Sequence, residues 1–386
     1  MTLKITNAKI VLRDGVLDGG VLLIDGDTIS YVGTLDTVKA DSVYDAGGAY
    51  LLPGFIDIHS HGGGGFDFMD ATAEEMLKIS DFHLSHGTTT LVATTLTDTW
   101  AAIEAALDTF ASLGERRKTL HGVHLEGPWF SPKQCGAQST ETMQKPSAQR
   151  LISLKAKYPF IERVSLAPEE DIDFAVGKAG KESGVIIALG HTDADFDTAR
   201  ASAKNGYTVA THLYSGMKGV ERVNAYRVAG CVEGVLYDDS LIAEVIADGK
   251  HLPEGLLKLI YKCKGADNIC LVTDSTRGAG MKDGEEMMLG KLIGGTPAII
   301  EDGVAKLPDR KSFAGSVATA DRLFYTMLSL SGAPIHEVSK MMSATPARAM
   351  GYTDRGEIKA GLLADLVVLD NEYKIKNIFL KGEMVK

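Results

Sequence analysis

The chain has 386 residues, of which 45% are hydrophobic, and a formal net charge of -11 at pH 7. A chain of this length buries a large core and exceeds the size of one small domain. Its acidic balance argues against a general binder of nucleic acid or of anionic membranes, because such proteins present a basic surface. An anionic small-molecule substrate is compatible with this charge, since a few arginines and helix N-termini can form one local positive pocket.

The cysteines and the apolar stretches limit the expected setting of the protein. No Cys-x-x-Cys spacing occurs, so the sequence indicates neither a disulfide scaffold nor a cysteine zinc site. The N-terminus lacks the apolar core of a signal peptide, and no stretch is long and apolar enough to span a membrane. We therefore expect a cytoplasmic protein. The cysteines are Cys135, Cys231, Cys263 and Cys270.

Short strands with tight turns are predicted at both ends of the chain. Residues 4–12, 20–24 and 28–32 alternate with turn signals, and so do residues 364–369 and 378–385. Because such strands need a partner sheet, we expect the two ends to pair. The sequence therefore predicts a small β-sandwich domain from residues 1–52 and 355–386, with a larger domain of residues 53–354 between them.

The middle of the chain alternates apolar runs with longer amphipathic segments. Eight strands alternating with helices predict a (β/α)8 barrel of the TIM type, whose active site lies at the C-terminal strand ends. A doubly wound sheet is the alternative, but no Gly-x-Gly-x-x-Gly opens a helix after the first strand. The predicted strands are residues 55–59, 89–94, 120–125, 163–167, 185–189, 208–211, 242–247 and 269–273. The predicted helices are residues 72–85, 99–113, 147–157, 172–183, 195–205 and 253–264, with 313–331 and 335–351 closing the domain.

A His-x-His pair follows the first predicted barrel strand. His59 and His61 are two residues apart, so on a strand they project to the same side and form half of a metal site. The four glycines at 62–65 are expected to leave room for a ligand near the backbone. An isolated His-x-His is more often an ordinary pair of structural histidines, so the assignment depends on further ligands elsewhere in the chain.

Polar residues also end the other predicted barrel strands. Nitrogen and oxygen ligands in this combination suit zinc, iron and other divalent transition metals. Their shared position at the C-terminal strand ends indicates a catalytic site in a barrel of this kind. The strand-end residues are Glu126, His191, His212, His251 and Asp274. The remaining histidines, for which a structural or surface role is expected, are His83, His86, His121, His124 and His336; a supporting role stays open for His124.

Residues 53–61 resemble the opening signature of the amidohydrolase superfamily, and residues 357–370 resemble its closing segment. Within that superfamily, the chain is similar to the deacetylases of 6-phosphorylated amino sugars. The His-Leu-Glu-Gly-Pro element at 124–128 is the most specific part, because it places the shared carboxylate on the third strand. Many relatives use a carboxylated lysine on the fourth strand instead, and residues 161–168 contain no lysine. Further matching segments are 136–138, 190–192, 211–214, 246–251, 272–275 and 314–316.

The resemblance implies a role for each matching residue. Glu126, His191 and His212 would hold one divalent ion, with zinc or iron expected. His59 and His61, with Glu126 bridging, would hold a second ion that some members lack. Asp274 is the implied general acid and base. The implied substrate contacts are Ala137, Gln138, Ser215, Gly216, Arg227, His251, Phe313, Ala314 and Gly315.

The implied reaction is hydrolysis of N-acetylglucosamine 6-phosphate to glucosamine 6-phosphate and acetate in amino-sugar catabolism, by a homodimer that shares residues across its active sites. Alternatives are the same reaction on the galacto epimer, hydrolysis or deamination of a cyclic amide, and a non-catalytic scaffold. The missing fourth-strand lysine disfavours the cyclic amide, and the retained ligands disfavour the scaffold.

Two positions depart from the family pattern. Gln138 stands where many members have histidine; its amide still donates a hydrogen bond, but not as a cation. The loop at 215–230 also differs, which leaves Arg227 as the first candidate to bind phosphate and Arg222 as the second, because a guanidinium suits phosphate oxygens.

Overall fold

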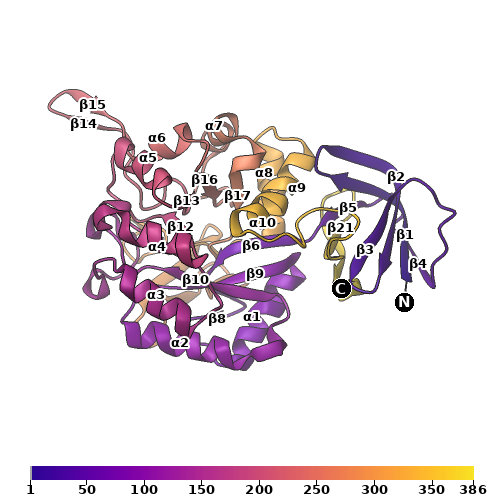
Figure 1. Ribbon diagram of the computed structural model, residues 1–386, viewed down its shortest axis with the longest axis horizontal. Coiled ribbons are helices and arrows are strands. Elements are labelled where there is room, and N and C mark those ends of the chain that lie inside the picture. The colour runs from indigo at the N-terminus through magenta and orange to yellow at the C-terminus, as the bar shows by residue number, and fades with distance from the viewer. Residues whose placement is uncertain (1) are drawn as a thin grey trace.

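The computed structural model describes residues 2–386, which form a helix-covered barrel at one end and a separate sheet at the other (Figure 1). Eight parallel strands pair in the order β17-β16-β13-β12-β11-β10-β9-β6. The ring closes above β6 and β17, where the Asp274 amide donates to His59 O at 2.9 Å and the His61 amide to Ser275 O at 2.8 Å. The predicted barrel is therefore confirmed. Its strands are β6 (Phe55–Ser60), β9 (Thr88–Thr95), β10 (Leu120–Glu126), β11 (Ile161–Leu166), β12 (Ile186–Leu189), β13 (Tyr207–Ala210), β16 (Ile242–Val245) and β17 (Ile269–Leu271).

The helices cover the outside of the barrel, with their apolar faces turned towards the strands. Side-chain caps explain where several begin: Thr72 and Glu75 form a capping box, and Thr99, Ser147 and Asp195 accept backbone N–H groups of the first turn. These helices lie close to their predicted bounds. They are α1 (Ala73–Ser85), α2 (Trp100–Ser112), α3 (Ala148–Lys157), α4 (Ala175–Ser183), α5 (Phe196–Lys204) and α7 (Glu254–Lys264).

The helices after the eighth strand differ from the prediction. Residues 313–319 are extended and α8 (Ala320–Leu330) begins only at 320, because Phe313 and Ser316 form β-bridges to Lys306 and Ser275. Residues 335–351 form two helices, α9 (Ile335–Met342) and α10 (Ala344–Met350), with the break at 343. Pro346 in the first turn of α10 fits a helix start and not a helix interior.

Among the elements that were not predicted, three features belong to the second half of the barrel domain. The first is the short helix α6 (Cys231–Tyr237). The second is the hairpin of β14 (Glu221–Val223) and β15 (Tyr226–Val228), whose turn residues Asn224 and Ala225 both have positive φ, as a tight hairpin requires. The third is the antiparallel sheet of β18 (Glu286–Leu289), β19 (Thr296–Glu301) and β20 (Val304–Lys306).

The separate sheet combines both ends of the chain, as predicted. Its order is β23-β22-β21-β5-β1-β2-β3, and β4 pairs with the first half of β1. Leu51, Leu366 and Phe379 are among the residues of its own apolar core. The exact boundaries between the two parts stay a prediction. The strands are β1 (Thr2–Leu12), β2 (Gly15–Asp25), β3 (Thr28–Gly33), β4 (Ser42–Asp45), β5 (Tyr50–Pro53), β21 (Leu366–Leu369), β22 (Ile375–Leu380) and β23 (Glu383–Met384).

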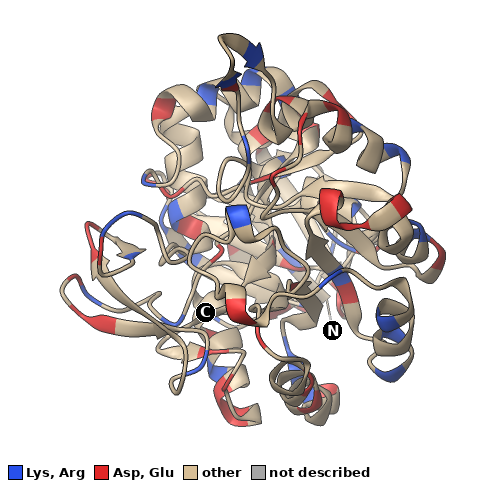
Figure 2. Ribbon diagram, turned by 90° about the vertical axis from the view of Figure 1, so that its left-hand side faces the viewer, with Lys and Arg blue, Asp and Glu red and all other residues tan. Residues whose placement is uncertain are grey.

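Acidic and basic side chains are interspersed over the helices and loops (Figure 2). Across residues 2–386, no helix combines the length and the apolar character that a membrane crossing requires.

Candidate active site

A cavity of about 240 Å³ opens at the C-terminal ends of the barrel strands. His59 lies directly behind it and is fully buried. Ala314 is also fully buried, next to the lining residues Phe313 and Gly315. Most of the sequence-predicted site residues therefore meet in one place. The lining residues are His61, Leu96, Glu126, Gly136, Ala137, Gln138, His191, His212, Ser215, Gly216, His251, Asp274, Leu289, Ser312, Phe313 and Gly315.

The first cluster of potential ligands consists of Glu126, His191 and His212. Glu126 ends β10, and each histidine lies two residues after the end of its strand, β12 or β13. The distance from Glu126 Oε1 is 3.0 Å to His212 Nε2 and 3.3 Å to His191 Nε2. All three residues are buried, so their polar atoms face one another away from bulk water.

The second cluster consists of His59, His61 and Asp274. Asp274 Oδ1 lies 3.3 Å from His59 Nε2 and 3.2 Å from His61 Nε2. Glu126 joins the two clusters, because its Oε2 is 3.3 Å from His61 Nε2 while its Oε1 faces His191 and His212. One carboxylate thus lies between two groups of imidazoles.

The donor set fits divalent ions, as the tautomers of two histidines show. His191 Nδ1 lies 2.8 Å from the carbonyl oxygen of Gln134, which only accepts, so Nδ1 carries the proton and Nε2 presents its lone pair. His59 Nδ1 is 3.2 Å from Glu244 Oε2, which fixes the same tautomer. In both cases a nitrogen lone pair faces carboxylate oxygens, and that repulsion is relieved by a cation between them.

Where no ion lies between the carboxylates and the histidines, protons on the facing imidazoles take the place of that cation, and this pairing keeps the two carboxylates ionised. Burial by itself disfavours the charged form, but the facing histidines outweigh it and hold the pKa of Glu126 well below its usual range. The same balance lowers the pKa of Asp274. For His61, burial is outweighed by Asp274 and Glu126, and the pKa lies well above its usual value. Both carboxylates are therefore available at neutral pH as ligands or as a base.

Three residues of the two clusters have strained backbones. His191, His212 and Asp274 have φ values of 46°, 30° and 46°, in the left-handed region that non-glycine residues rarely adopt. Each such residue costs about 1–3 kcal/mol, and this strain is typical of functional sites because the surrounding structure has to maintain it. The turn after each strand directs the side chain into the cavity.

Gln138 is oriented by a backbone group outside the clusters. Thr97 N donates to its Oε1 at 3.0 Å, so its amide nitrogen faces the cavity. That nitrogen donates to Glu126 Oε2 at 2.7 Å and lies 3.3 Å from His191 Nε2. The side chain therefore supports the shared carboxylate.

The predicted sugar-phosphate contacts lie on the other side of the cavity. His251 Nδ1 is 2.9 Å from Asp248 Oδ2, and the imidazole packs on the ring of Phe313 with centroids 4.6 Å apart. Ser215 and Gly216 follow His212 closely in the chain. A side chain at 216 would meet His191 Nδ1 at 2.8 Å, and φ is +56°, so this position needs glycine.

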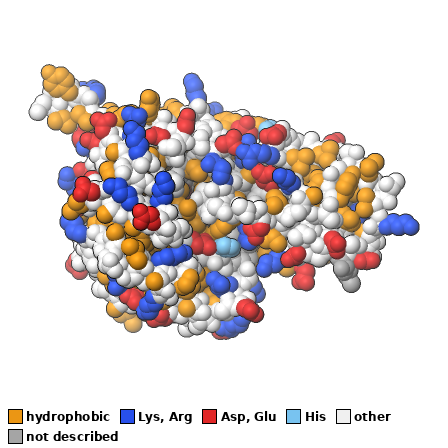
Figure 3. Space-filling model, viewed as in Figure 1, with side chains coloured by type: hydrophobic (Ala, Val, Ile, Leu, Met, Phe, Trp, Pro, Cys, Tyr) orange, Lys and Arg blue, Asp and Glu red, His pale blue; other side chains and the backbone are white. Residues whose placement is uncertain are grey.

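Arg227 and Arg222 do not reach the cavity of their own chain. They are directly opposite each other on the exposed β14–β15 hairpin, which projects away from the barrel (Figure 1). The tip of this projection is partly apolar in the space-filling view (Figure 3), in agreement with the 78% exposed side chain of Tyr226. Their role in binding phosphate stays a prediction.

The glycines after His61 serve local packing and turn formation, and their expected role in leaving room for a ligand stays a prediction. A Cβ atom at Gly62 would lie 2.1 Å from the carbonyl oxygen of Phe66, and one at Gly63 would lie 2.6 Å from the ring of Phe82. The backbone forms a small hairpin of β7 (Gly62–Gly63) and β8 (Phe66–Asp67). Its turn residues, Gly64 and Gly65, have positive φ.

The other histidines make structural contacts where the structure records a partner. His83 is buried, and its Nε2 donates to Gly62 O at 2.9 Å. His86 pairs with Asp321 and His121 with Glu162. His124 Nε2 is 2.6 Å from Ser165 Oγ, and its ring packs against His59 with centroids 4.7 Å apart. His124 therefore supports the ring of His59, a potential metal ligand, from beneath.

Arg163 and Glu244 were not predicted as site residues, and they form a fully buried ion pair inside the barrel. Burial opposes the charge of Glu244, but the charges of Arg163 and His59 outweigh it and lower the pKa of the carboxyl to about 2. The available signal was a charged residue in the middle of a largely apolar strand, Arg163 in β11 and Glu244 in β16, which indicates an interior partner.

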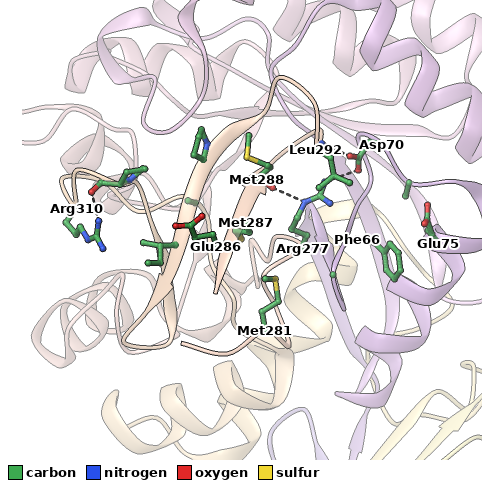
Figure 4. A pocket seen from close by; sticks show the side chains of 16 residues that line it. Phe66, Asp70, Glu75, Arg277, Met281, Glu286, Met287, Met288, Leu292 and Arg310 are labelled. Atoms are coloured by element: carbon green, nitrogen blue, oxygen red, sulfur yellow. Dashed lines mark hydrogen bonds and ion pairs between the residues drawn. The ribbon is translucent and has the colours of Figure 1, made fainter. Parts of the chain in front are cut away.

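A second, largely apolar cavity of about 750 Å³ lies beside the β18–β20 sheet (Figure 4). Met288 lines this cavity, while its neighbour Leu289 lines the active-site cavity. Arg277 crosses the second cavity, donating to Met288 O at 2.8 Å and to Asp70 Oδ1 at 2.9 Å. Strand β18 thus contributes to the lining of both cavities, and among the residues described the two clusters of potential ligands lie at the smaller one.

Comparison with known proteins identifies the family. Residues 50–385 match the Amidohydrolase family. The N-acetylglucosamine-6-phosphate deacetylase of Lysinibacillus sphaericus is 33% identical over 345 residues, which cover 88% of this chain and 86% of that protein. The N-acetylgalactosamine-6-phosphate deacetylase of Escherichia coli O157:H7 is 29% identical over 392 residues. The match covers 100% of this chain and 99% of that protein.

A solved structure agrees with these relatives. It is a mutant N-acetyl-D-glucosamine-6-phosphate deacetylase of Mycobacterium smegmatis in complex with N-acetyl-D-glucosamine-6-phosphate. The TM-score is 0.91 at 31% identity, and the match covers 100% of this chain and 99% of that one. This chain therefore belongs to the amidohydrolase family of metal-dependent hydrolytic enzymes.

Proposed function

We propose that this protein is a metal-dependent deacetylase that hydrolyses N-acetyl-D-glucosamine 6-phosphate to D-glucosamine 6-phosphate and acetate. The observation that carries the proposal is the position of Glu126, which faces both His61 and the His191–His212 pair, while Asp274 also contacts His61. A relative and a solved structure support the substrate, because each is named for this phosphorylated sugar. Their alignments cover 88% and 100% of this chain.

Glu126, His191 and His212 would hold one divalent ion, and His59 and His61 with Glu126 would hold a second. Such an ion supplies Lewis-acid polarisation of a carbonyl and lowers the pKa of water towards neutrality. Imidazole and carboxylate ligands favour zinc or iron. Both clusters retain their ligands, so we propose one or two ions in each subunit.

Asp274 is the residue that would move the proton. Amide hydrolysis requires water to add to the acetyl carbon, the C–N bond to break and the departing amine to gain a proton. The lowered pKa of Asp274 keeps it ionised at neutral pH, so it can take the proton from water. The same carboxyl then returns that proton to the amine, which balances the reaction.

The remaining residues would orient the sugar and exclude water. Gln138 holds Glu126 through its amide and leaves the acetyl group space beside Ala137. Ser215, Gly216 and His251 would face the sugar phosphate. Arg227 would approach from the partner subunit of a homodimer, because its hairpin projects out of its own subunit (Figure 1). We expect the cytoplasm as the compartment, where phosphorylated sugars are available.

The test measures acetate released from the N-acetyl forms of glucosamine and galactosamine, each with and without the 6-phosphate, together with the metal content of the same sample. We expect the phosphorylated gluco sugar to react fastest. Faster acetate release from N-acetylgalactosamine 6-phosphate would mean that the galacto epimer is the substrate and that the proposed deacetylation chemistry is correct. If metal-loaded protein hydrolysed neither phosphorylated sugar, the proposal would be wrong.

A further inference from the structure

Glu244 lies beneath both ligand clusters, on β16, and is fully buried. Its Oε2 is 3.2 Å from His59 Nδ1, in the second cluster. The same oxygen is 3.2 Å from the backbone nitrogen of His212, in the first cluster. One carboxylate oxygen therefore contacts one predicted ligand of each ion.

Arg163 fixes the other oxygen of this carboxylate. Its Nη1 pairs with Glu244 Oε1, and its Nη2 donates to Thr211 Oγ1 at 3.0 Å. Nη1 also donates to Ile58 O at 3.3 Å. The guanidinium thus binds the backbone or side chain of the residue just before each of the two histidines. The ion pair holds β6 and the end of β13 at a fixed distance from β16.

The contacts of Glu244 determine the state of each histidine. The carboxylate only accepts, so His59 Nδ1 has to carry a proton and His59 Nε2 is left with the lone pair that binds a cation. His212 has a φ of 30°, and the hydrogen bond to its N–H helps to hold this strained backbone. Neither task depends on contact with substrate.

We propose that Glu244 is a positioning residue that sets the tautomer of His59 and the backbone of His212, with Arg163 as its anchor. The inference rests on the proposed function in that it takes these histidines as metal ligands. It assigns Glu244 no contact with the substrate or with the ion. Loss of its carboxylate would therefore weaken metal binding even where the fold is intact.

Glu244→Gln is the informative substitution because glutamine has nearly the same shape. Its amide oxygen would turn towards Arg163, which only donates, and its NH2 group would then face His59 Nδ1 and His212 N–H. A donor at this place favours the His59 tautomer that carries its proton on Nε2, where no cation can bind. The buried charge of Arg163 would also lose its partner and destabilise the fold.

A double variant separates these two effects. In Arg163→Met/Glu244→Leu, no unpaired buried charge remains and no group at 244 can accept from His59 Nδ1, so thermal stability should recover towards the wild-type value while the acceptor stays absent. The matched control is Glu162→Gln, which removes a carboxylate that pairs with His121 at 2.8 Å, far along the same barrel from the ligand clusters. Its metal affinity should equal that of the wild type.

The experiment titrates metal-free protein with Co²⁺ and records the visible absorption spectrum, alongside thermal unfolding. We expect Co²⁺ affinity to fall about 10- to 100-fold in Glu244→Gln and to stay low in the double variant. Wild-type affinity in the double variant would mean that Glu244 is only the charge partner of Arg163, and the proposal would be overturned. If Glu244→Gln does not fold, the double variant alone decides the question.

Because this readout needs no substrate, it is independent of the deacetylase assay. A wild type that binds Co²⁺ but releases no acetate would refute the proposed function, while the variants would still test Glu244.

Discussion

The side-chain amide of Gln138 donates a 2.7 Å hydrogen bond to Glu126 Oε2. Since Thr97 N holds the amide oxygen of Gln138, this donor is fixed in place before any substrate arrives. The glutamine thus orients the one carboxylate that faces both ligand clusters. Many family members have histidine at this position. In this chain the glutamine contacts Glu126, a potential metal ligand.

Gln138→Leu tests this role, because leucine fills a similar volume without donating. A buried carboxylate that loses a hydrogen bond costs about 1.5–3 kcal/mol, which corresponds to a fall of roughly 10- to 150-fold in kcat/KM for acetate release. The control is Gln144→Leu, which removes a contact to Trp100 Nε1 outside the cavity and should leave the rate unchanged. A wild-type rate in Gln138→Leu would show that Glu126 needs no such donor.

Asp274→Asn should abolish proton transfer and preserve the shape of the site. We expect kcat for acetate release to fall by a factor of about 10² to 10⁴, the usual range for general acid–base catalysis. Metal content has to be measured on the same sample, because Asp274 also lies within 3.3 Å of His59 and His61. A near-normal rate with normal metal content would assign the acid and base to another residue.

The sequence was sufficient for the barrel and for the cluster of polar residues at its strand ends. Buried parallel strands are continuous apolar runs, and residues that end such strands meet at one rim of the barrel, so Glu126, His191, His212 and Asp274 could be placed together. Their distances from one another were beyond a single sequence, because each depends on how the turn after a strand bends.

Most of the parts that were missed depend on long-range packing. Arg163 and Glu244 are 81 residues apart, and neither neighbourhood shows that the other exists. The extended segment at 313–319 is held by bridges to Lys306 and Ser275, whereas the break between α9 and α10 has a local signal in Pro346. The β14–β15 hairpin is exposed on both faces, so no apolar alternation marked it as a pair of strands.

The buried side chain of His83 is expected to lower the free energy of unfolding in acid. Burial lowers its pKa to about 4, and Nδ1 has no hydrogen-bond partner within residues 2–386, so a second proton there would be unpaired. The unfolded state, with a pKa near 6.5, binds more protons than the folded state between these values. Stability is therefore complete above about pH 6.5 and is lost as the pH falls towards 4.

The expected loss between pH 7.5 and pH 5 is about 2 kcal/mol from His83 alone. His83→Gln, which can still donate to Gly62 O, should lose correspondingly less over the same interval in urea unfolding. His336→Gln, at the start of α9, is the control and should keep the wild-type pH dependence. Identical pH dependence in the wild type and His83→Gln would contradict the assignment.

Arg227 predicts a phosphate contact made across a dimer interface. Arg227→Ala should raise KM for N-acetylglucosamine 6-phosphate by roughly 10- to 100-fold, because a charge-assisted hydrogen bond to phosphate is lost. The unphosphorylated sugar should react as in the wild type. Arg222→Ala is the matched control on the opposite strand of the hairpin, and the larger effect identifies the arginine that binds phosphate.

Mixed subunits show whether Arg227 acts within its own chain. Arg227→Ala and Asp274→Asn proteins are unfolded together in equal amounts, refolded and assayed at a substrate concentration below KM. If the arginine crosses the interface, half of the dimers are mixed and each contains one site with intact Asp274 and an intact partner arginine. Activity should then return to about a quarter of the wild-type value. If no activity returns in a sample that sedimentation shows to be dimeric, Arg227 serves its own subunit, and its hairpin has to fold back over the cavity.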